Sequence, residues 1–354
     1  MKNNYLLLFV CLLMLSFLGI SCSEDKQNSL PTLNLEEMDT YIAKMNNILD
    51  TAHVGETDGT FPRENQIALQ NALVTLQTGK SKAEAGEFIL QYEIDNYCIA
   101  AKKAIQDFMD SFQQTLLAGT DAELRVFGID QKGHIEFGAS ADYGGGDAFT
   151  VEAWLKYNSG FFESAIGDFI TTFNNTAIPY EGWMINFMGS NLRATIGMGP
   201  QSGRVLEFGA AYPTNYGEWN HIAIVYNASL AEGQLKMYVN GNLLFEKTND
   251  IYDSNNVLQS YQPNVANTNM WAFQEPTDLS RCMTGYIKKF RMWNSAKSID
   301  QINTLKNSDV TGNEEGLICA WDFTKVPTDP TNIPDKTGRH SAVLVGKYKW
   351  YTLN

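Results

Sequence analysis

The feature that most constrains this sequence is a series of short runs in which apolar and polar residues alternate. In one of them Phe149, Val151 and Leu155 alternate with Thr150 and Lys156. A period of two is typical of β-strands, because successive side chains of a strand point to opposite faces of its sheet. About a dozen such runs, broken by glycine, asparagine, aspartate and proline, fit between residues 125 and 354. They predict an all-β sandwich over residues 125–354.

Two local signals inside this range predict how its elements are connected. Asn240-Gly241 follows a strand pattern, and this dipeptide favours the positive φ angles of a type I′ hairpin turn. Ser298 followed by Gln301 is the pattern of a capping box, so a short helix is expected to begin there. The β-region is therefore expected to contain a tight hairpin at residue 240 and one late helix.

Residues 34–120 show helical periodicity instead. Apolar residues recur three and four positions apart, for example at Leu69 and Leu73. Capping signals and a proline predict three helices, over residues 34–52, 62–79 and 81–116. Apolar stripes of this kind must be buried against one another, so we expect a three-helix bundle. Its simplest role is that of a spacer, and a module that docks protein or glycan is the alternative.

The chain begins with a targeting segment. Lys2 precedes an apolar run over residues 5–17 that is short for a membrane span, and small residues then lead to Cys22. The segment resembles a lipoprotein signal peptide, which implies that residues 1–21 are removed and that Cys22 is acylated. An ordinary secretory signal is the alternative.

The residues after Cys22 predict where the protein is held. Residues 22–33 are polar and carry a proline, so we expect a tether. Glu24-Asp25 resembles the export tag of Gram-negative surface lipoproteins. That resemblance implies an outer-membrane lipoprotein that faces the cell exterior and contacts the membrane through its lipid anchor.

The charge balance of the chain is acidic, with 26 basic against 40 acidic side chains. We therefore expect no nucleic-acid partner, because phosphate recognition needs a basic surface. Anionic polymers in general are disfavoured for the same reason. A local site can nevertheless depart from the overall sign.

The cysteine pattern argues against a zinc site, because no two cysteines are spaced as CxxC. Cys98 lies in a helical pattern and is expected to be a small buried residue. A disulfide between Cys282 and Cys319 is left open, because sequence alone cannot place their Cα atoms within bridging range.

Four segments, taken in order, resemble one known fold. They are residues 149–156, residues 219–226 with 237–241, residues 285–293 and residues 316–323. Together they resemble the laminin-G-like branch of the concanavalin A-like lectin/glucanase superfamily, which implies a jelly-roll sandwich and favours carbohydrate as the ligand. That branch often has an acidic pair where this chain has Lys288-Lys289, so any role of the acidic pair is lost. The fold itself does not decide a function.

The patterns of catalytic residues are missing. Retaining glucanases of this fold carry the pattern Glu-x-Asp-x-x-Glu on one strand, which places two carboxylates on one face of the sheet. The β-region does not contain this pattern, and the chain has no Gly-x-Ser-x-Gly. The histidines show no metal-binding spacing, and His221 is expected to be a structural polar residue. A glycoside hydrolase whose carboxylates come from separate strands remains the alternative.

Sugar binding needs aromatic rings for the apolar faces of a pyranose and amide or backbone groups for its hydroxyls. Three loop-rich stretches combine these residue types. The ring-bearing candidates for carbohydrate binding are Tyr180, Trp183, Tyr212, Tyr216 and Trp271. For Trp183 and Trp271, burial in the core is an equally strong alternative, and Trp293 and Trp321 are expected to be buried.

Calcium is an open question, and no other cofactor is expected. Relatives of this fold often bind calcium through aspartates and backbone carbonyls on loops at the rim of the sandwich. The resemblance implies weak candidates among the loop acids, namely Asp130, Asp142, Asp147 and Asp278. Solvated loop acids are the alternative interpretation in so acidic a chain.

These observations favour one function over two others. We expect a non-catalytic surface lipoprotein that captures polysaccharide or oligosaccharide and passes it to neighbouring glycan-uptake proteins. The alternatives are a glycoside hydrolase and a protein-adhesion module, as laminin-G domains can be.

Overall fold

The computed structural model describes residues 33–352 except Ile89 and residues 130–131, 158–165, 175–179, 199–203, 213–216 and 264–267. The chain divides into two compact units, with the boundary between Gln114 and Thr115. The expected signal peptide, Cys22 and the tether as far as residue 32 lie outside the described residues. Within those residues, no helix is both long enough and apolar enough to cross a membrane.

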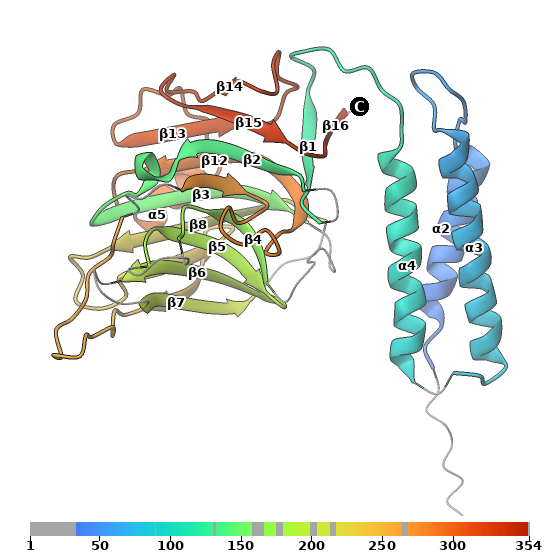
Figure 1. The fold of residues 1–354 in the computed structure, drawn as a ribbon, viewed down its shortest axis with the longest axis horizontal. Coiled ribbons are helices and arrows are strands. Elements are labelled where there is room, and N and C mark those ends of the chain that lie inside the picture. The colour runs from blue at the N-terminus through green and yellow to red at the C-terminus, as the bar shows by residue number, and fades with distance from the viewer. Residues whose placement is uncertain are drawn as a thin grey trace, which may run out of the picture. The chain divides into compact units, whose positions relative to one another are not determined.

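The first unit consists of helices whose apolar faces meet. It contains α2 (Glu36–Thr51), α3 (Arg63–Glu84) and α4 (Gln91–Asp110) (Figure 1). Met38 of α2, Leu76 of α3 and Phe108 of α4 are almost fully buried in a shared cluster. Helices of this length gain most of their stability from such burial. Cys98 lies in this cluster as expected, and burial raises the pKa of its thiol to about 11.

The predicted break between the second and third helices was wrong. Gly79 does not end α3 but lies inside it, where a Cβ atom would come within 2.7 Å of the Tyr97 ring on α4. The glycine therefore lets two helices approach closely. The hydroxyl of Ser81 donates to the carbonyl of Gln77 within the same helix instead of capping a new one. α4 then begins at Gln91 and ends at Asp110, before the predicted end at residue 116.

The second unit is a jelly-roll sandwich of two antiparallel sheets, as the sequence predicted (Figure 1). The first sheet contains, in spatial order, β10 (Asn242–Lys247), β9 (Leu235–Val239), β8 (Asn220–Asn227), β3 (Ala148–Lys156), β12 (Thr284–Trp293), β1 (Ala122–Phe127) and β16 (Tyr348–Thr352), and β13 (Leu317–Asp322) also pairs with β12. The second contains β14 (Ile333–Pro334), β15 (Ser341–Val345), β2 (His134–Ala139), β11 (Asn269–Ala272), β4 (Ile166–Thr171), β5 (Trp183–Met188), β6 (Asn191–Met198) and β7 (Arg204–Ala211). A short 3-10 helix, η1 (Ser140–Tyr143), follows β2.

The alternation in β3 is confirmed. Phe149, Val151 and Leu155 are fully buried in the core between the sheets. The opposite side of β3 is buried as well, because α5 (Ile299–Leu305) and the segment before it cover part of the outer face of the first sheet. Thr150 on that side accepts a hydrogen bond from the amide of Lys297.

Both predicted connection signals are confirmed. Asn240 and Gly241 adopt φ angles of 53° and 82° and join β9 to β10. The amide of Ser298 donates to the Gln301 side chain at 2.8 Å, and the amide of Gln301 donates to the Ser298 hydroxyl at 3.3 Å. Cys282 and Cys319 are both buried free thiols, so the disulfide left open by the sequence is not formed.

Two glycines in the turns before and after β15 give a test of this packing. Gly346 and Gly338 have nearly the same φ, 68° and 70°, but only Gly346 lies against backbone: a Cβ atom there would come within 2.3 Å of the Lys132 carbonyl oxygen. Gly338→Ala should cost about 1 kcal/mol of unfolding free energy, the strain of a left-handed conformation. Gly346→Ala should cost about 1–3 kcal/mol more, because the backbone must shift.

Denaturant unfolding followed by tryptophan fluorescence measures this difference. All seven tryptophans lie after residue 150, so the signal reports the sandwich alone. Equal losses for the two variants would show that the turn at Gly346 is not closely packed.

Candidate ligand-binding sites of the sandwich

The aromatic residues proposed for sugar binding do not form one patch. Trp183 is fully buried between the sheets, and its indole nitrogen donates to the carbonyl of Tyr143 at 2.7 Å. It alternates with Ile185 and Phe187 along β5, and all three side chains therefore face the core. The assignment of Trp183 as a carbohydrate-binding residue was wrong.

Tyr180 and Tyr212 lie at opposite ends of β5. Tyr180 is half-buried just before the strand begins, with its ring 5.8 Å from that of Phe173. The amide of Tyr212 bonds to Ser190 in the turn after the strand, and its ring packs 5.4 Å from Phe187. A strand of this length spans roughly 17–20 Å, so the two rings cannot share one sugar. Tyr216 lies outside the described residues.

Trp271 lies on the outer face of the second sheet. It is half-buried on β11, directly opposite Glu136 of β2 and Thr171 of β4. Its ring is stacked on His134, with ring centres 4.1 Å apart, and His134 contacts the Glu136 carboxylate at 3.1 Å. One face of the indole is therefore already occupied by a neighbouring ring of the protein.

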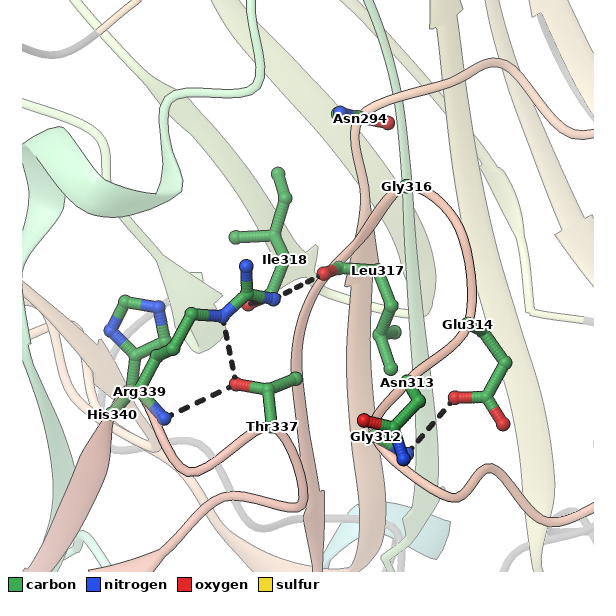
Figure 2. A pocket seen from close by; sticks show the side chains of 10 residues that line it. All are labelled: Asn294, Gly312, Asn313, Glu314, Gly316, Leu317, Ile318, Thr337, Arg339 and His340. Carbon is green, nitrogen blue, oxygen red and sulfur yellow. Dashed lines mark hydrogen bonds between the residues drawn. The ribbon is translucent and has the colours of Figure 1, made fainter.

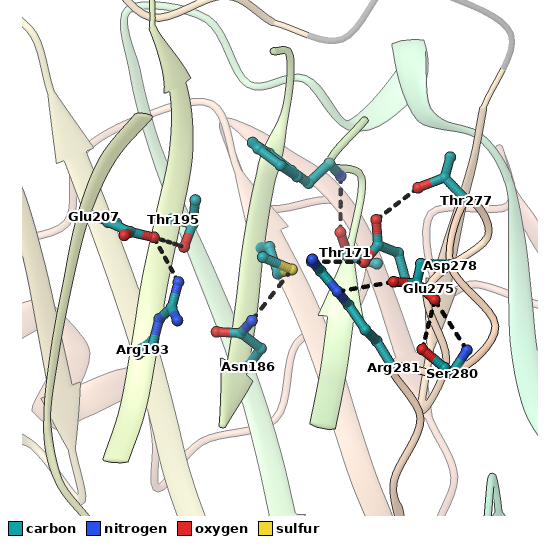
Figure 3. A network of polar contacts seen from close by, with 12 residues as sticks. Thr171, Asn186, Arg193, Thr195, Glu207, Glu275, Thr277, Asp278, Ser280 and Arg281 are labelled. Atoms are coloured by element: carbon teal, nitrogen blue, oxygen red, sulfur yellow. Dashed lines mark hydrogen bonds and ion pairs between the residues drawn. The ribbon is translucent and has the colours of Figure 1, made fainter. Parts of the chain in front are cut away.

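A network of polar contacts crosses the same outer face (Figure 3). Arg193 of β6 pairs with Glu207 of β7 at 2.5 Å. On the other side, Arg281 of the β11–β12 connection pairs with Glu275 at 3.1 Å and with Asp278 at 3.2 Å. Because all three residues belong to this connection, the two pairs cross-link it internally.

A buried acid pair lies within this network. Asp168 of β4 and Glu275 are both fully buried, and Asp168 stands directly opposite Asn186 of β5. Burial, and then the neighbouring Glu275 carboxyl, raises the pKa of Asp168 well above its usual range. The pair has the chemistry of an acid that holds its proton, but neither side chain is exposed, so no glycosidic bond can reach it.

The loop acids named as calcium candidates do not converge. Asp142 and Asp147 are exposed, and Asp130 lies outside the described residues. Asp278 accepts hydrogen bonds from Ser280, which together with Arg281 lower its pKa. In the described part of the chain, no group of three or more His, Cys, Asp or Glu side chains could hold a metal ion.

His221 is structural, as the sequence predicted. Its Nε2 lies 3.0 Å from one carboxylate oxygen of Glu152, and the indole nitrogen of Trp293 donates to the other at 2.8 Å. All three side chains are buried on the outer face of the first sheet, under cover of its neighbours. A buried hydrogen-bonded group of this kind fixes side chains in place.

The sandwich has a hollow of about 480 Å³ at one end of β12 (Figure 2). Three connections line it: Asn294 after β12, residues 312–318 at the start of β13, and the turn at Thr337–His340 before β15. We refer to it as the rim hollow. Its lining carries amide, carboxylate, guanidinium, hydroxyl and imidazole groups, and His340 supplies its one ring among the lining residues.

Hydrogen bonds hold the walls of the rim hollow. Arg339 donates to Thr337 at 3.1 Å and to the carbonyls of Leu317 and Ile318 at 2.5 and 3.0 Å. Glu314 accepts from the amide of Gly312 at 3.0 Å. Burial opposes ionisation of Glu314, but bonds from Thr311 and Gly312 lower its pKa, so the wall contains a carboxylate.

Two amide side chains are placed for a ligand. Asn294 and Asn313 are exposed and line the rim hollow. Gly316 lets Asn294 approach the backbone, since a Cβ atom at 316 would lie 2.5 Å from Asn294 Oδ1. Amides both donate and accept hydrogen bonds, which suits hydroxyl groups. Reasoning from the sequence missed these residues because it searched for aromatic rings, and the three segments lie far apart in the chain.

Sequence comparison matches two known families to the two units. The profile described as the concanavalin A-like lectin/glucanases superfamily matches residues 127–303, which is half of the chain. A domain of unknown function, DUF4972, matches residues 33–112. No curated protein matches the chain.

Two solved structures are similar to this chain over about two thirds of its length. One is a Bacteroides ovatus protein described provisionally as carbohydrate-binding, with 16% identity and a TM-score of 0.47 over 69% of this chain. This chain spans 62% of the length of that protein. The other is a heptameric pentraxin from Limulus polyphemus, with 12% identity and a TM-score of 0.39 over 66% of this chain and 95% of the pentraxin.

Asp168→Asn tests the buried acid pair. The unfolded chain ionises this aspartate in its usual range, whereas the folded state holds the proton to a higher pH because its pKa is raised, so stability falls as pH rises above the usual range. The variant should therefore melt at a higher temperature than the natural protein at neutral pH, and the difference should shrink as the pH falls towards 4, near the ordinary aspartate pKa of about 3.9.

Thermal melting across this pH range measures the effect. Asp142→Asn, at an exposed position of η1, is the matched control and should change the midpoint little at any pH. A lower midpoint for Asp168→Asn at neutral pH would mean that Asp168 is ionised and stabilising.

Proposed function

Because this chain belongs to the concanavalin A-like lectin/glucanase superfamily, we propose that it binds carbohydrate without cleaving it. The proposed site is the rim hollow, and the proposed ligand is a short neutral stretch of a polysaccharide or oligosaccharide. The volume of about 480 Å³ is in the range of ligand sites, about 300–1,000 Å³.

The composition of the hollow carries this proposal. Its lining is dominated by hydrogen-bonding groups, with Leu317 and Ile318 as its larger apolar members. A ligand of low polarity would leave the amides of Asn294 and Asn313 without partners, which is costly. A hydroxyl-rich ligand satisfies these amides. The side chains of Arg339 and Glu314, which line the hollow, already form hydrogen bonds within the protein.

The same lining argues against hydrolysis. Glycosidases need two carboxyl groups on either side of the bond that breaks. Among the residues that line the hollow, Glu314 is the one carboxylate, and backbone amides occupy its oxygens. The buried pair of Asp168 and Glu275 is closed to substrate.

The N-terminal residues support a cellular location for this binding activity. Cys22 and the acidic residues after it favour a lipid-anchored protein at the outer surface of the cell. The helical unit then acts as a spacer between anchor and sandwich, and neighbouring uptake proteins would receive the captured glycan. A sugar-binding module held on the membrane by acyl chains suits this arrangement.

Asn294→Ala and Asn313→Ala test the rim hollow. Each variant should weaken the binding of a polysaccharide ligand about threefold to tenfold, the effect of one lost hydrogen bond of about 1 kcal/mol. The double variant should lose more. Screening a panel of neutral polysaccharides by affinity electrophoresis identifies the ligand, and calorimetry then gives the dissociation constants.

Asn255→Ala is the matched control, since it removes an exposed asparagine from the connection between β10 and β11. Loss of binding in the control but not in the variants of the rim hollow would indicate that the ligand binds at that loop. Release of reducing sugar from any member of the panel would replace the proposal with a hydrolase.

Cys22→Ser tests the anchor. The variant should lose labelling by radioactive palmitate and should leave the membrane fraction when the full chain is expressed in a Gram-negative host. Cys11→Ser, within the apolar run, is the control and should keep both properties. Palmitate labelling that survives Cys22→Ser would refute acylation at this residue.

A further inference from the structure

A row of basic and aromatic side chains crosses the first sheet away from the rim hollow. Lys349 of β16 and Arg125 of β1 are directly opposite each other, Arg125 is opposite Tyr286 of β12, and Tyr286 is opposite Lys156 of β3. Residues opposite each other in an antiparallel ladder lie on the same face. Because Leu124 and Leu155, their neighbours in the chain, fill the core, this row lies on the outer face.

Three more side chains widen the row into a patch. Trp219 precedes β8 and lies with its ring 6.5 Å from Tyr286, while the Tyr351 ring lies 5.9 Å from Tyr286 on the other side. The Lys288 ammonium lies 5.9 Å from the Trp219 ring. We call this surface the lysine–aromatic patch; it comprises Lys156, Trp219, Tyr286, Lys288, Lys349 and Tyr351, and each of these side chains is half-buried.

Cation–π contacts hold the patch together. The Lys156 ammonium lies 4.4 Å from the Tyr286 ring centre and 4.9 Å from that of Trp219. Arg125 is buried beneath, 5.5 Å from the Tyr286 ring. Such contacts restrain the rings, while the lysine ammonium groups remain near the surface.

The local charge of the patch is opposite to that of the protein. The carboxylate of Glu123 contacts the patch: it pairs with Lys156 and accepts a hydrogen bond from the Trp219 indole at 2.7 Å. The positive charges of the patch come from Lys156, Lys288 and Lys349, with Arg125 buried beneath them. A net positive surface of this kind in a chain with a net charge of −14 concentrates positive potential at one place.

From this juxtaposition we propose that the lysine–aromatic patch is a second ligand site, which binds an acidic polysaccharide whose sugar rings carry carboxylates. The rings of Trp219 and Tyr351 offer apolar surface to the faces of the sugars, and the lysine ammonium groups pair with the carboxylates. Neighbouring strands lie about 4.8 Å apart, and the Tyr286 ring on β12 has a cation on the strand at either side, so a sugar near this ring has positive charge within reach.

The surroundings of the patch favour a sparsely charged polymer over a dense polyanion. Nucleic acid carries one charge per roughly 1.7 Å and needs an extended basic surface, which a chain of net charge −14 opposes beyond the patch. An anionic membrane would likewise be repelled by the acidic surface that surrounds the patch. A uronate polymer has one charge for each sugar and an apolar face on each ring, which matches the mixed composition of the patch.

The site is independent of the rim hollow. Tyr286 and Asn294 are eight residues apart along β12 and its end, which corresponds to about 27 Å at about 3.4 Å per residue. Variants of one site should therefore leave binding at the other unchanged, and failure of the neutral-glycan proposal does not affect this one.

The test uses the full mature chain and an oligomer of polygalacturonate, with the methyl-esterified oligomer as the uncharged counterpart. The acidic oligomer should bind at low salt and more weakly at high salt, and the ester should bind at least about tenfold more weakly. Lys288→Gln with Lys349→Gln should reduce affinity for the acidic oligomer at least about tenfold, the usual effect of losing bonds to charged groups.

Two controls separate charge from folding. Lys236→Gln removes a lysine from β9 of the same sheet and should leave the affinity unchanged. Lys288→Arg with Lys349→Arg keeps the charge and should keep most of the binding, and equal melting temperatures show that all variants are folded. Equal affinity for the two oligomers, or unchanged affinity in the double glutamine variant, would overturn the proposal. Equally tight binding of duplex DNA or of phosphatidylglycerol vesicles would also overturn it, because the patch would then be a general polyanion surface.

Discussion

The structure depends on the apolar core that two antiparallel sheets enclose between them. Since strand side chains alternate between faces, every second residue of β3 and β5 is committed to this core, and large rings such as Trp183 fill it. Burying one large apolar side chain contributes roughly 1.5–3 kcal/mol, so rings on inward positions are closed to a ligand. Groups that bind ligands must therefore come from outer faces and from the connections at the ends of strands.

The outer faces are used in different ways. On the first sheet, α5 covers one part, where Glu152, His221 and Trp293 form a buried hydrogen-bonded group, while the lysine–aromatic patch occupies another part. On the second sheet, an ion pair between Arg281 and Glu275 cross-links the β11–β12 connection. The fully buried acid pair there shows that polar residues on an outer face need not be accessible.

The two proposed sites differ in the chemistry that each can recognise. The rim hollow is concave and lined by amides and backbone, which suits uncharged hydroxyl groups. The lysine–aromatic patch is an open surface of rings and ammonium groups, which suits apolar sugar faces that carry carboxylates. Both are built around β12, whose two halves pair with β1 and with β13 and so position the surroundings of each site.

The sequence by itself determined the two units, the jelly-roll class and several local features, because these depend on neighbouring residues. The Asn240-Gly241 turn, the Ser298–Gln301 cap and the inward side of β3 follow from such short-range rules. Gly79 shows the limit of those rules: it reads as a helix end, but the packing of Tyr97 against it keeps the helix continuous. The tertiary structure alone decided which polar and aromatic residues meet. Asn294, Glu314 and Arg339 come from three separate connections, and Lys349 and Tyr286 share one outer face only because both are paired with Arg125 of β1, which lies between β16 and β12. The periodicity of apolar residues in the sequence cannot predict such pairings, since they depend on the order of strands in the sheet and on which outer faces remain uncovered.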